Sequence, residues 1–341
     1  YTILPFLLDK VGLNVAQAMG DVDPYIYEAV STEDTLPTET EREYTARRKR
    51  YEQIRADFAA GKISTVNDLI TYNLDIQTFT EDFLRGPEMT ATPVMLRRFY
   101  EALTHLTVLD PTCGSGAFLF AALNILEPLY ELCLDKMTQV TAGKDGAKYP
   151  DFRAELDRVN QHPNRKYFVY KSIIVNNLYG VDIMDEAVEI CKLRLFLKLV
   201  AQVDDPRRVE PLPDIDFNIR AGNTLVGFAT KDEITFGGGL WANEATHRIE
   251  TLAGALNTFR QQQLQGQANA TTLKTLKQAA QKAQTEIAAQ LDKALFDLYG
   301  AKDFAAWRAS HKPFHWYAEF NAVMANGGFD VIVGNPPYVE Y

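Results

Sequence analysis

The sequence predicts an α/β fold in which parallel strands form a doubly wound sheet. Two short apolar runs, Val108–Asp110 and Phe329–Val333, have the character of buried strands, and each enters a polar turn. Parallel strands require helical crossovers, so strand, turn and helix signals together favour this fold class. After Asp182, apolar residues recur at the spacing expected of a helix that packs on a sheet, namely Ala187, Ile190, Cys191, Leu193, Leu195, Phe196 and Leu199.

The turn within Val108–Leu119 has the form of a nucleotide site built from a strand, a loop and a helix. Gly114 and Gly116 let the backbone approach a ligand closely, and the helix that begins near Ala117 presents free amide hydrogens. Asp110 stands at the carboxyl end of the strand, where open parallel sheets bind ligands. Because an anion there favours the cationic end of a cofactor over a pyrophosphate, we expect S-adenosylmethionine rather than a dinucleotide.

The apolar run Phe329–Val333 leads, after Gly334, into Asn335-Pro336-Pro337-Tyr338. Each proline fixes its own φ and keeps the preceding residue extended, so this turn is stiff. The side-chain oxygen of Asn335 and the carbonyl of Pro336 could both accept hydrogen bonds from a planar exocyclic amine, while Tyr338 stacks on the base that carries it. This pattern predicts methyl transfer to nitrogen. The alternative is an ordinary loop after a buried strand.

Together these segments resemble the adenine-N6 DNA methyltransferases of restriction-modification and phage-defence systems. The order, with cofactor motifs before the catalytic motif, is similar to the gamma-type order of type IIG methylases. The resemblance covers about residues 80–230 and 312–341. It implies a class I S-adenosylmethionine-dependent methyltransferase domain, a Rossmann-like doubly wound sheet, that is incomplete on the C-terminal side because the chain ends three residues after Tyr338.

The resemblance also implies roles for cofactor residues. Thr92 would contact the methionine carboxylate, Asp182 would hold the ribose hydroxyls, and Ile183 would pack on the cofactor adenine. Asn223 stands where many relatives have Asp, and its amide oxygen can still accept from the adenine amine. The glycine loop would supply the remaining contacts, from Asp110, Pro111, Thr112, Gly114 and Gly116.

The domain organisation follows from these motifs. Residues 1–80 are expected to form a helical N-terminal region, and residues 81–341 the methyltransferase domain. That domain would carry a polar insertion at 138–165 and a helical insertion at 240–311, the latter with a helical hairpin within Glu250–Leu298. The hairpin could be a spacer, a partner surface or a DNA clamp, and a spacer is the default.

Composition sets further limits. The 341 residues carry a net charge of -10, which argues against wrapping nucleic acid by bulk electrostatics but permits a local groove. The basic clusters Arg47–Arg50 and Arg97–Arg98 are expected on solvated faces. No run long enough to span a bilayer and no signal peptide are expected, and three scattered cysteines fit a reduced cytoplasm.

The sequence therefore predicts a cytoplasmic, site-specific DNA adenine-N6 methyltransferase. Its cofactor would be S-adenosylmethionine, its substrate double-stranded DNA with a flipped-out adenine, and its partners could include defence-system subunits. No metal is required, and residues 1–80 show no nuclease pattern. Two alternatives stay open: a methyltransferase that acts on RNA or on protein glutamine, and a non-catalytic subunit that senses cofactor or DNA.

Overall fold

The computed structural model describes residues 2–87, 89, 92–203, 210, 212–238, 242–265 and 269–335. The chain divides into two compact units. The N-terminal unit comprises Tyr1–Leu103 and Pro128–Arg153, and the sheet unit comprises Thr104–Glu127 and Ala154–Tyr341. Each unit is described separately below.

The N-terminal unit is helical in its described residues. Its longest early helix, α4, begins after Thr40, which forms a reciprocal capping box with Glu43. Apolar faces of α1 and α6 supply much of the core, including Leu7, Leu8 and Phe79. The helices before the glycine loop are α1 (Ile3–Val11), α2 (Val15–Met19), α3 (Glu28–Ser31), α4 (Glu41–Ala59), α5 (Val66–Thr71), α6 (Ile76–Arg85) and α8 (Pro93–His105), with a 3-10 turn η1 at Asp23–Tyr25.

The basic cluster on α4 has a structural use. The Arg47 guanidinium hydrogen-bonds to both carboxylate oxygens of Glu39, at 2.7 and 2.9 Å, and to the carbonyl of Thr32 at 2.6 Å. The hydrogen bond from Arg47 lowers the pKa of Glu39 to about 2. Arg97 likewise pairs with Asp151 at 2.6 Å. The expectation of a solvated face is therefore wrong for Arg47, whose side chain is only 9% exposed. Its guanidinium stabilises the segment that precedes α4 through these hydrogen bonds.

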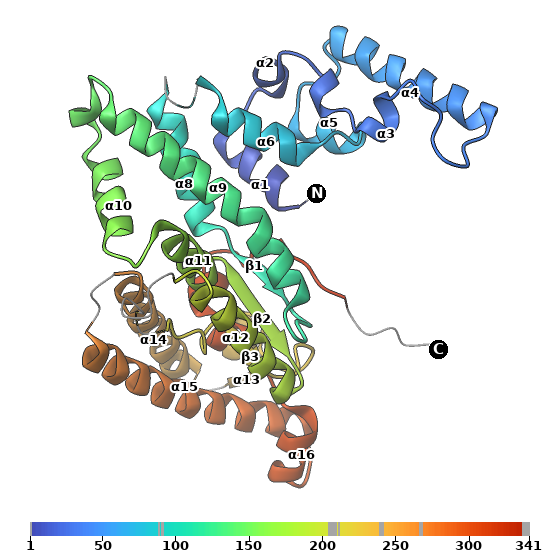
Figure 1. The fold of residues 1–341 in the computed structure, drawn as a ribbon. Coiled ribbons are helices and arrows are strands. Elements are labelled where there is room, and N and C mark those ends of the chain that lie inside the picture. Colours follow the sequence, from blue (N-terminus) through green and yellow to red (C-terminus); the bar gives the residue numbers. More distant parts are fainter. Residues whose placement is uncertain are drawn as a thin grey trace. The chain divides into compact units, whose positions relative to one another are not determined.

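In its described residues the sheet unit contains four parallel strands, in the order β3-β2-β1-β4, of which β1, β2 and β3 are labelled in Figure 1. Their bounds are β1 Val108–Asp110, β2 Leu178–Asp182, β3 Ile219–Ala221 and β4 Val331–Ile332. In register, Asp110 faces Gly180 and Asp182 faces Ala221. Since every strand runs the same way, the residues that follow the strands gather at one edge. The predicted α/β class with a parallel sheet is confirmed.

Helices connect the strands and flank the sheet. The segment 138–165, expected as a polar excursion, contains the end of α9, a 3-10 turn and α10. On α12 the buried residues include Cys191 and Leu195, but Ile190 and Leu193 are half-exposed. The buried residues of α12 are spaced three or four positions apart, from Val188 to Leu199, so the predicted packing is wrong for those two residues. The helices are α9 (Ala117–Ala142), η2 (Gly146–Lys148), α10 (Pro150–Asn160), α11 (Arg165–Asn176), α12 (Asp185–Val200), α13 (Lys231–Gly238), α14 (Ala242–Gln263), α15 (Ala270–Tyr299), α16 (Phe304–His311), α17 (Trp316–Glu319) and α18 (Asn321–Met324).

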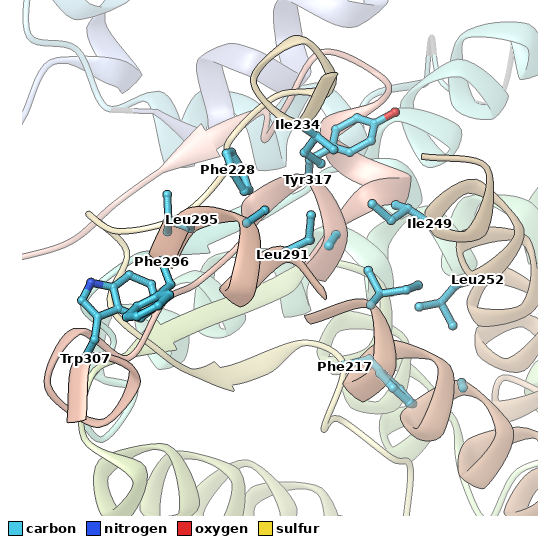
Figure 2. Close-up of a cluster of buried hydrophobic side chains, with 14 of the residues drawn as sticks. Phe217, Phe228, Ile234, Ile249, Leu252, Leu291, Leu295, Phe296, Trp307 and Tyr317 are labelled. Atoms are coloured by element: carbon cyan, nitrogen blue, oxygen red, sulfur yellow. The ribbon is translucent and has the colours of Figure 1, made fainter. Parts of the chain in front are cut away.

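The predicted helical hairpin is present as α14 and α15. Its apolar residues Ile249, Leu252 and Leu291 share one buried cluster with Phe217, which precedes β3, and Tyr317 of α17 (Figure 2). Polar contacts reinforce this packing at the sheet. Arg220 of β3 donates to Gln284 at 2.8 Å, and Gln284 donates to Glu319 at 2.6 Å. The hairpin is therefore part of the core of the sheet unit rather than a detached spacer.

Helix α9 corrects one expectation from composition. Among the described helices it is long and apolar enough to cross a membrane, by length and composition alone. Its buried residues include Leu123, Leu126 and Leu134, and Pro128 lies inside it. Core helices of soluble proteins meet the same criterion, so the finding is weak evidence for a membrane segment.

Candidate cofactor and catalytic site

Asp110, the last residue of β1, is almost completely buried at the carboxyl edge of the sheet. Its Oδ1 accepts a hydrogen bond from the Thr112 amide at 3.1 Å, whereas its Oδ2 has no partner in the described part of the chain. Burial raises the pKa of the Asp110 carboxyl, and the nearby Asp182 carboxylate contributes in the same direction. The Thr112 hydroxyl is also buried without a described partner. Such groups are costly unless a ligand completes them, and a cation suits the carboxylate.

The glycine loop after β1 is fixed to the neighbouring strand. The amide of Cys113 donates to the Val181 carbonyl at 2.9 Å, and the amide of Gly114 donates to Asp182 Oδ2 at 2.8 Å. Gly116 has a φ of +87°, and a Cβ there would lie 2.6 Å from the Cys191 sulfur. Any side chain at this position would therefore be both strained and crowded. The glycine loop is therefore fixed in position at the carboxyl edge of the sheet, next to the end of β2.

The loop after β2 presents an acid and an apolar residue side by side. Asp182 accepts from Gly114 through Oδ2 and from the Met184 amide through Oδ1, at 2.9 Å. Carboxylate oxygens have further lone pairs, so these bonds leave Asp182 able to accept from hydroxyl groups. Ile183 follows, with 49% of its surface exposed at the same edge. This pairing is compatible with the predicted ribose and adenine contacts, which stay predictions.

The loop after β3 is built around Asn223. Its side-chain oxygen accepts from the Leu225 backbone amide at 3.1 Å, and the backbone amide of Asn223 donates to the Lys312 carbonyl at 2.8 Å. A parallel bridge joins Asn223 to Pro313. The amide oxygen retains a second lone pair, so the predicted contact with an adenine amine is chemically available.

The segment after β4 passes directly against the start of the glycine loop. Val333 donates to the Leu109 carbonyl at 2.8 Å, which continues the pairing beyond the strand. A Cβ on Gly334 would lie 3.1 Å from Asp110 Oδ1 and 3.3 Å from Thr112 Oγ1. Asn335 is the next residue and is exposed. Pro336 and Tyr338 lie outside the described residues, so their predicted roles are neither supported nor contradicted.

The remaining predicted cofactor residues are Thr92 and Pro111. Thr92 belongs to the N-terminal unit, where it is exposed immediately before α8 and its carbonyl accepts from Met95 at 2.9 Å. Its predicted contact with the methionine carboxylate stays a prediction. Pro111 lies in the glycine loop, and its Cδ would be 3.4 Å from a Cβ on Gly334.

Sequence reasoning missed a brace at the other end of β4. The Thr107 amide and hydroxyl both donate to Asp330 Oδ2 at 2.9 Å, and the Asp330 amide donates back to Thr107 Oγ1 at 3.0 Å. These residues are 223 positions apart in sequence, so no local pattern could have found the contact. The brace sets the register of β4 and hence the position of Gly334.

His315 and Trp316 lie in the segment between α16 and β4. The structure places His315 in the core, where Nδ1 accepts from the Phe228 amide at 3.1 Å and Nε2 meets Asp292 at 3.0 Å. Trp316 donates to the Thr224 carbonyl at 3.0 Å. Both residues therefore hold the segment before β4 against the chain that follows β3, His315 as a buried residue and Trp316 as a partly buried one.

Comparison with known proteins identifies the type of site. Residues 176–341 match the family described as Eco57I restriction-modification methylase, and residues 87–210 match the MmeI DNA-methyltransferase domain. Together the two matches cover residues 87–341, so this part of the chain is similar to methylase domains. Every predicted site residue of this methylase region falls within one or both matches, and Asp182 falls within both.

Two curated relatives agree with the methylase families. One, named as a type II restriction enzyme and methyltransferase of Methanocaldococcus jannaschii, is 28% identical over 78% of this chain. The other, a type II restriction enzyme and methyltransferase of Escherichia coli, is 27% identical over 36% of this chain. The chain spans only 25% and 11% of these relatives. No solved structure matches it.

Proposed function

We propose that the protein is a site-specific DNA adenine-N6 methyltransferase of a restriction-modification or phage-defence system, with a class I catalytic domain and S-adenosylmethionine as cofactor. One observation carries the proposal. The buried Asp110 carboxylate, one oxygen of which has no partner among the described residues, lies beside Gly334, and Gly334 leads directly into Asn335. Asp110 and the residue before Asn335 are therefore neighbours at one sheet edge, as an anionic subsite next to an amine-accepting turn would require.

The residues at this edge fit S-adenosylmethionine. The cofactor carries an electrophilic methyl group on a positively charged sulfur and an ammonium group, and it would supply that methyl. Asp110 and Thr112 would bind its cationic methionine end, since both have buried oxygens without a described partner. Asp182 and Ile183 would take its ribose and adenine, with Asn223 beside them. Thr92 would contact the methionine carboxylate.

The turn after β4 would act on the substrate. A flipped-out adenine would stack on Tyr338, at an unstacking cost of about a few kcal/mol. Asn335 and the Pro336 carbonyl would accept hydrogen bonds from the amine at N6 and so favour the lone-pair geometry needed for attack. The stiff proline pair limits the motion of these acceptors, which favours in-line alignment with the donor.

Two other functions use the same chemistry. Any planar amine could meet the acceptors of the turn, so RNA bases and protein glutamine amides are alternative substrates. A subunit of a defence complex could also keep the site to sense cofactor or DNA without turnover. The family matches favour DNA over RNA and protein, because both families are restriction-modification or DNA-methyltransferase families.

The test is expression of the full-length protein in a bacterial strain that lacks adenine methylation, followed by sequencing that detects modified bases. The proposal predicts N6-methyladenine at one fixed sequence context throughout the genome, and none in cells that carry Asn335→Ala. Modified RNA or protein with an unmodified genome would establish an alternative substrate. Cofactor binding with no modification of any of them would establish the sensor.

A further inference from the structure

Lys312 joins the two cofactor loops although it belongs to none of the predicted motifs. Its Nζ donates to the Ile183 carbonyl at 3.0 Å, in the loop after β2, and to Asp185 Oδ2 at 2.9 Å, at the first residue of α12. Its own carbonyl accepts from the Asn223 amide at 2.8 Å, in the loop after β3. One residue thus contacts the loop that carries Ile183 and the loop that carries Asn223.

The same residue ends helix α16, which closes the helical insertion. The Lys312 amide donates to the Arg308 carbonyl, as a helix C-cap does. Pro313 follows and forms the parallel bridge with Asn223. The insertion is therefore connected to the cofactor edge at the point where the chain returns from α16 toward β4.

The backbone of Lys312 is unusual for its residue type. It has a φ of +43°, in the left-handed region where glycine is the ordinary helix cap. A lysine there costs conformational free energy that a glycine would not. Its Nζ contacts to Ile183 and Asp185 are made by the side chain alone, so replacement by glycine removes them and leaves a residue that suits the backbone.

Lys312 also lines a cavity of about 470 Å³ at this edge. Asp185, Ala221, Gly222 and Pro313 line it too, and Arg308 of the insertion completes one side. The cavity therefore lies beside the ends of β2 and β3, and Asp182, Ile183 and Asn223 are not among the residues that line it.

We propose that Lys312 is a positioning residue, which holds the loops after β2 and β3 in the spacing that admits the nucleoside end of S-adenosylmethionine. It acts through Ile183 and Asn223 rather than on the reacting methyl. This inference rests on the proposed function, and it assigns a role in the site to the end of the helical insertion.

The test uses the full-length protein with three substitutions. Lys312→Gly removes the side chain and suits the backbone, Lys312→Met removes the charge but keeps most of the stem, and Lys302→Gly is the matched control on an exposed loop of the same insertion. Both Lys312 variants should raise the Kd and KM for S-adenosylmethionine about three- to tenfold, as expected for partly exposed charged hydrogen bonds. Their kcat should stay within about twofold, because the transition-state contacts are intact.

Measurements without cofactor separate positioning from folding. Lys312→Gly should melt no lower than the wild type, while the Met184 and Gly114 amides, both bonded to Asp182, exchange hydrogen faster. Equal cofactor affinity in Lys312→Gly and wild type would overturn the inference. A melting temperature of Lys312→Gly low enough to explain its loss of cofactor affinity by unfolding would overturn it as well. A wild type that binds no S-adenosylmethionine would instead overturn the proposed function, and this inference with it.

Discussion

The loops after β1 and β4 lie next to each other but are held in different ways. The glycine loop after β1 is tied to β2 by the amides of Cys113 and Gly114, and its Asp110 is buried. The segment after β4 reaches the same place through the close approach of Gly334, and Asn335 beyond it is exposed. We propose that the first loop binds the cofactor and that the second presents Asn335 to the substrate. Cofactor binding and methyl transfer should therefore be separable by mutation.

Substitution of Asn335 should have the largest effect. In Asn335→Ala the amine loses a side-chain acceptor, so kcat should fall about 10³-fold, the upper range for removal of one electrostatic contact. The Kd for S-adenosylmethionine should stay within about twofold, since no described cofactor contact is removed. Titration calorimetry and a methyl-transfer assay would measure the two quantities on one preparation.

The matched control for that variant is Asn326→Ala, an exposed asparagine of the sheet unit that donates to the Ala322 carbonyl at 2.7 Å. It should transfer methyl groups at the wild-type rate. An Asn335→Ala protein with normal kcat would show that the turn after β4 does not handle the amine, and the comparison of the two loops would fail.

Asp110→Asn should weaken the binding of S-adenosylmethionine. The substitution keeps the size of the side chain and removes its charge, so affinity for S-adenosylmethionine should fall about 10- to 100-fold. The free protein should be at least as stable, because a buried charge without a described partner is lost. Calorimetric titration and thermal unfolding would measure both. The control is Asp297→Asn, at an exposed residue of α15. Loss of cofactor affinity in both variants would refute a specific role of Asp110 in cofactor binding.

The raised pKa of Asp110 gives a smaller, pH-dependent effect. A carboxyl whose pKa is raised by folding contributes stability that is fully present at pH values below the pKa it has in the unfolded chain. This contribution is lost as pH rises through the raised pKa of the folded protein. Cofactor affinity should change in the opposite sense and weaken as pH falls through the same range, because the cation requires ionised Asp110. Binding isotherms over pH would test this. An Asp110→Asn protein that keeps the full wild-type pH dependence would assign it to another group.

Gly334→Ala should have the smallest effect. Its Cβ would press on Asp110 Oδ1 and Thr112 Oγ1, so we expect a loss of about 1–2 kcal/mol in the free energy of unfolding. Both kcat and cofactor affinity should fall, since this residue lies between the two loops. Denaturant unfolding would measure the loss. Gly254→Ala, within α14 where a Cβ meets nothing within 4 Å, should instead gain about 0.5–1 kcal/mol.

The sequence predicted the parts of the site that depend on local pattern. Asp110, Gly114 and Gly116 are recognisable because strand, turn and helix follow each other within twelve residues, and the structure confirms this succession of elements. Their contacts with a cofactor stay predictions. The helical hairpin was likewise visible from its periodicity. The burial of Arg47 and the exposure of Ile190 depend on which neighbour each helix meets, so periodicity alone could not settle them.

The contacts that sequence reasoning missed join distant segments. Thr107 meets Asp330, and Lys312 meets Ile183, across separations of 223 and 129 residues. No motif within either segment encodes such a pair, because strand order and helix packing decide them. A left-handed lysine after a helix is a further case, since glycine is the residue that pattern rules expect there.

The most direct test of the account is a single turnover of the full-length protein preloaded with methyl-labelled S-adenosylmethionine and mixed with unmethylated double-stranded DNA. The account predicts that label leaves the protein with one exponential phase and appears as N6-methyladenine after hydrolysis of the DNA. Protein that binds the labelled cofactor but leaves every nucleoside of the DNA unlabelled would contradict it.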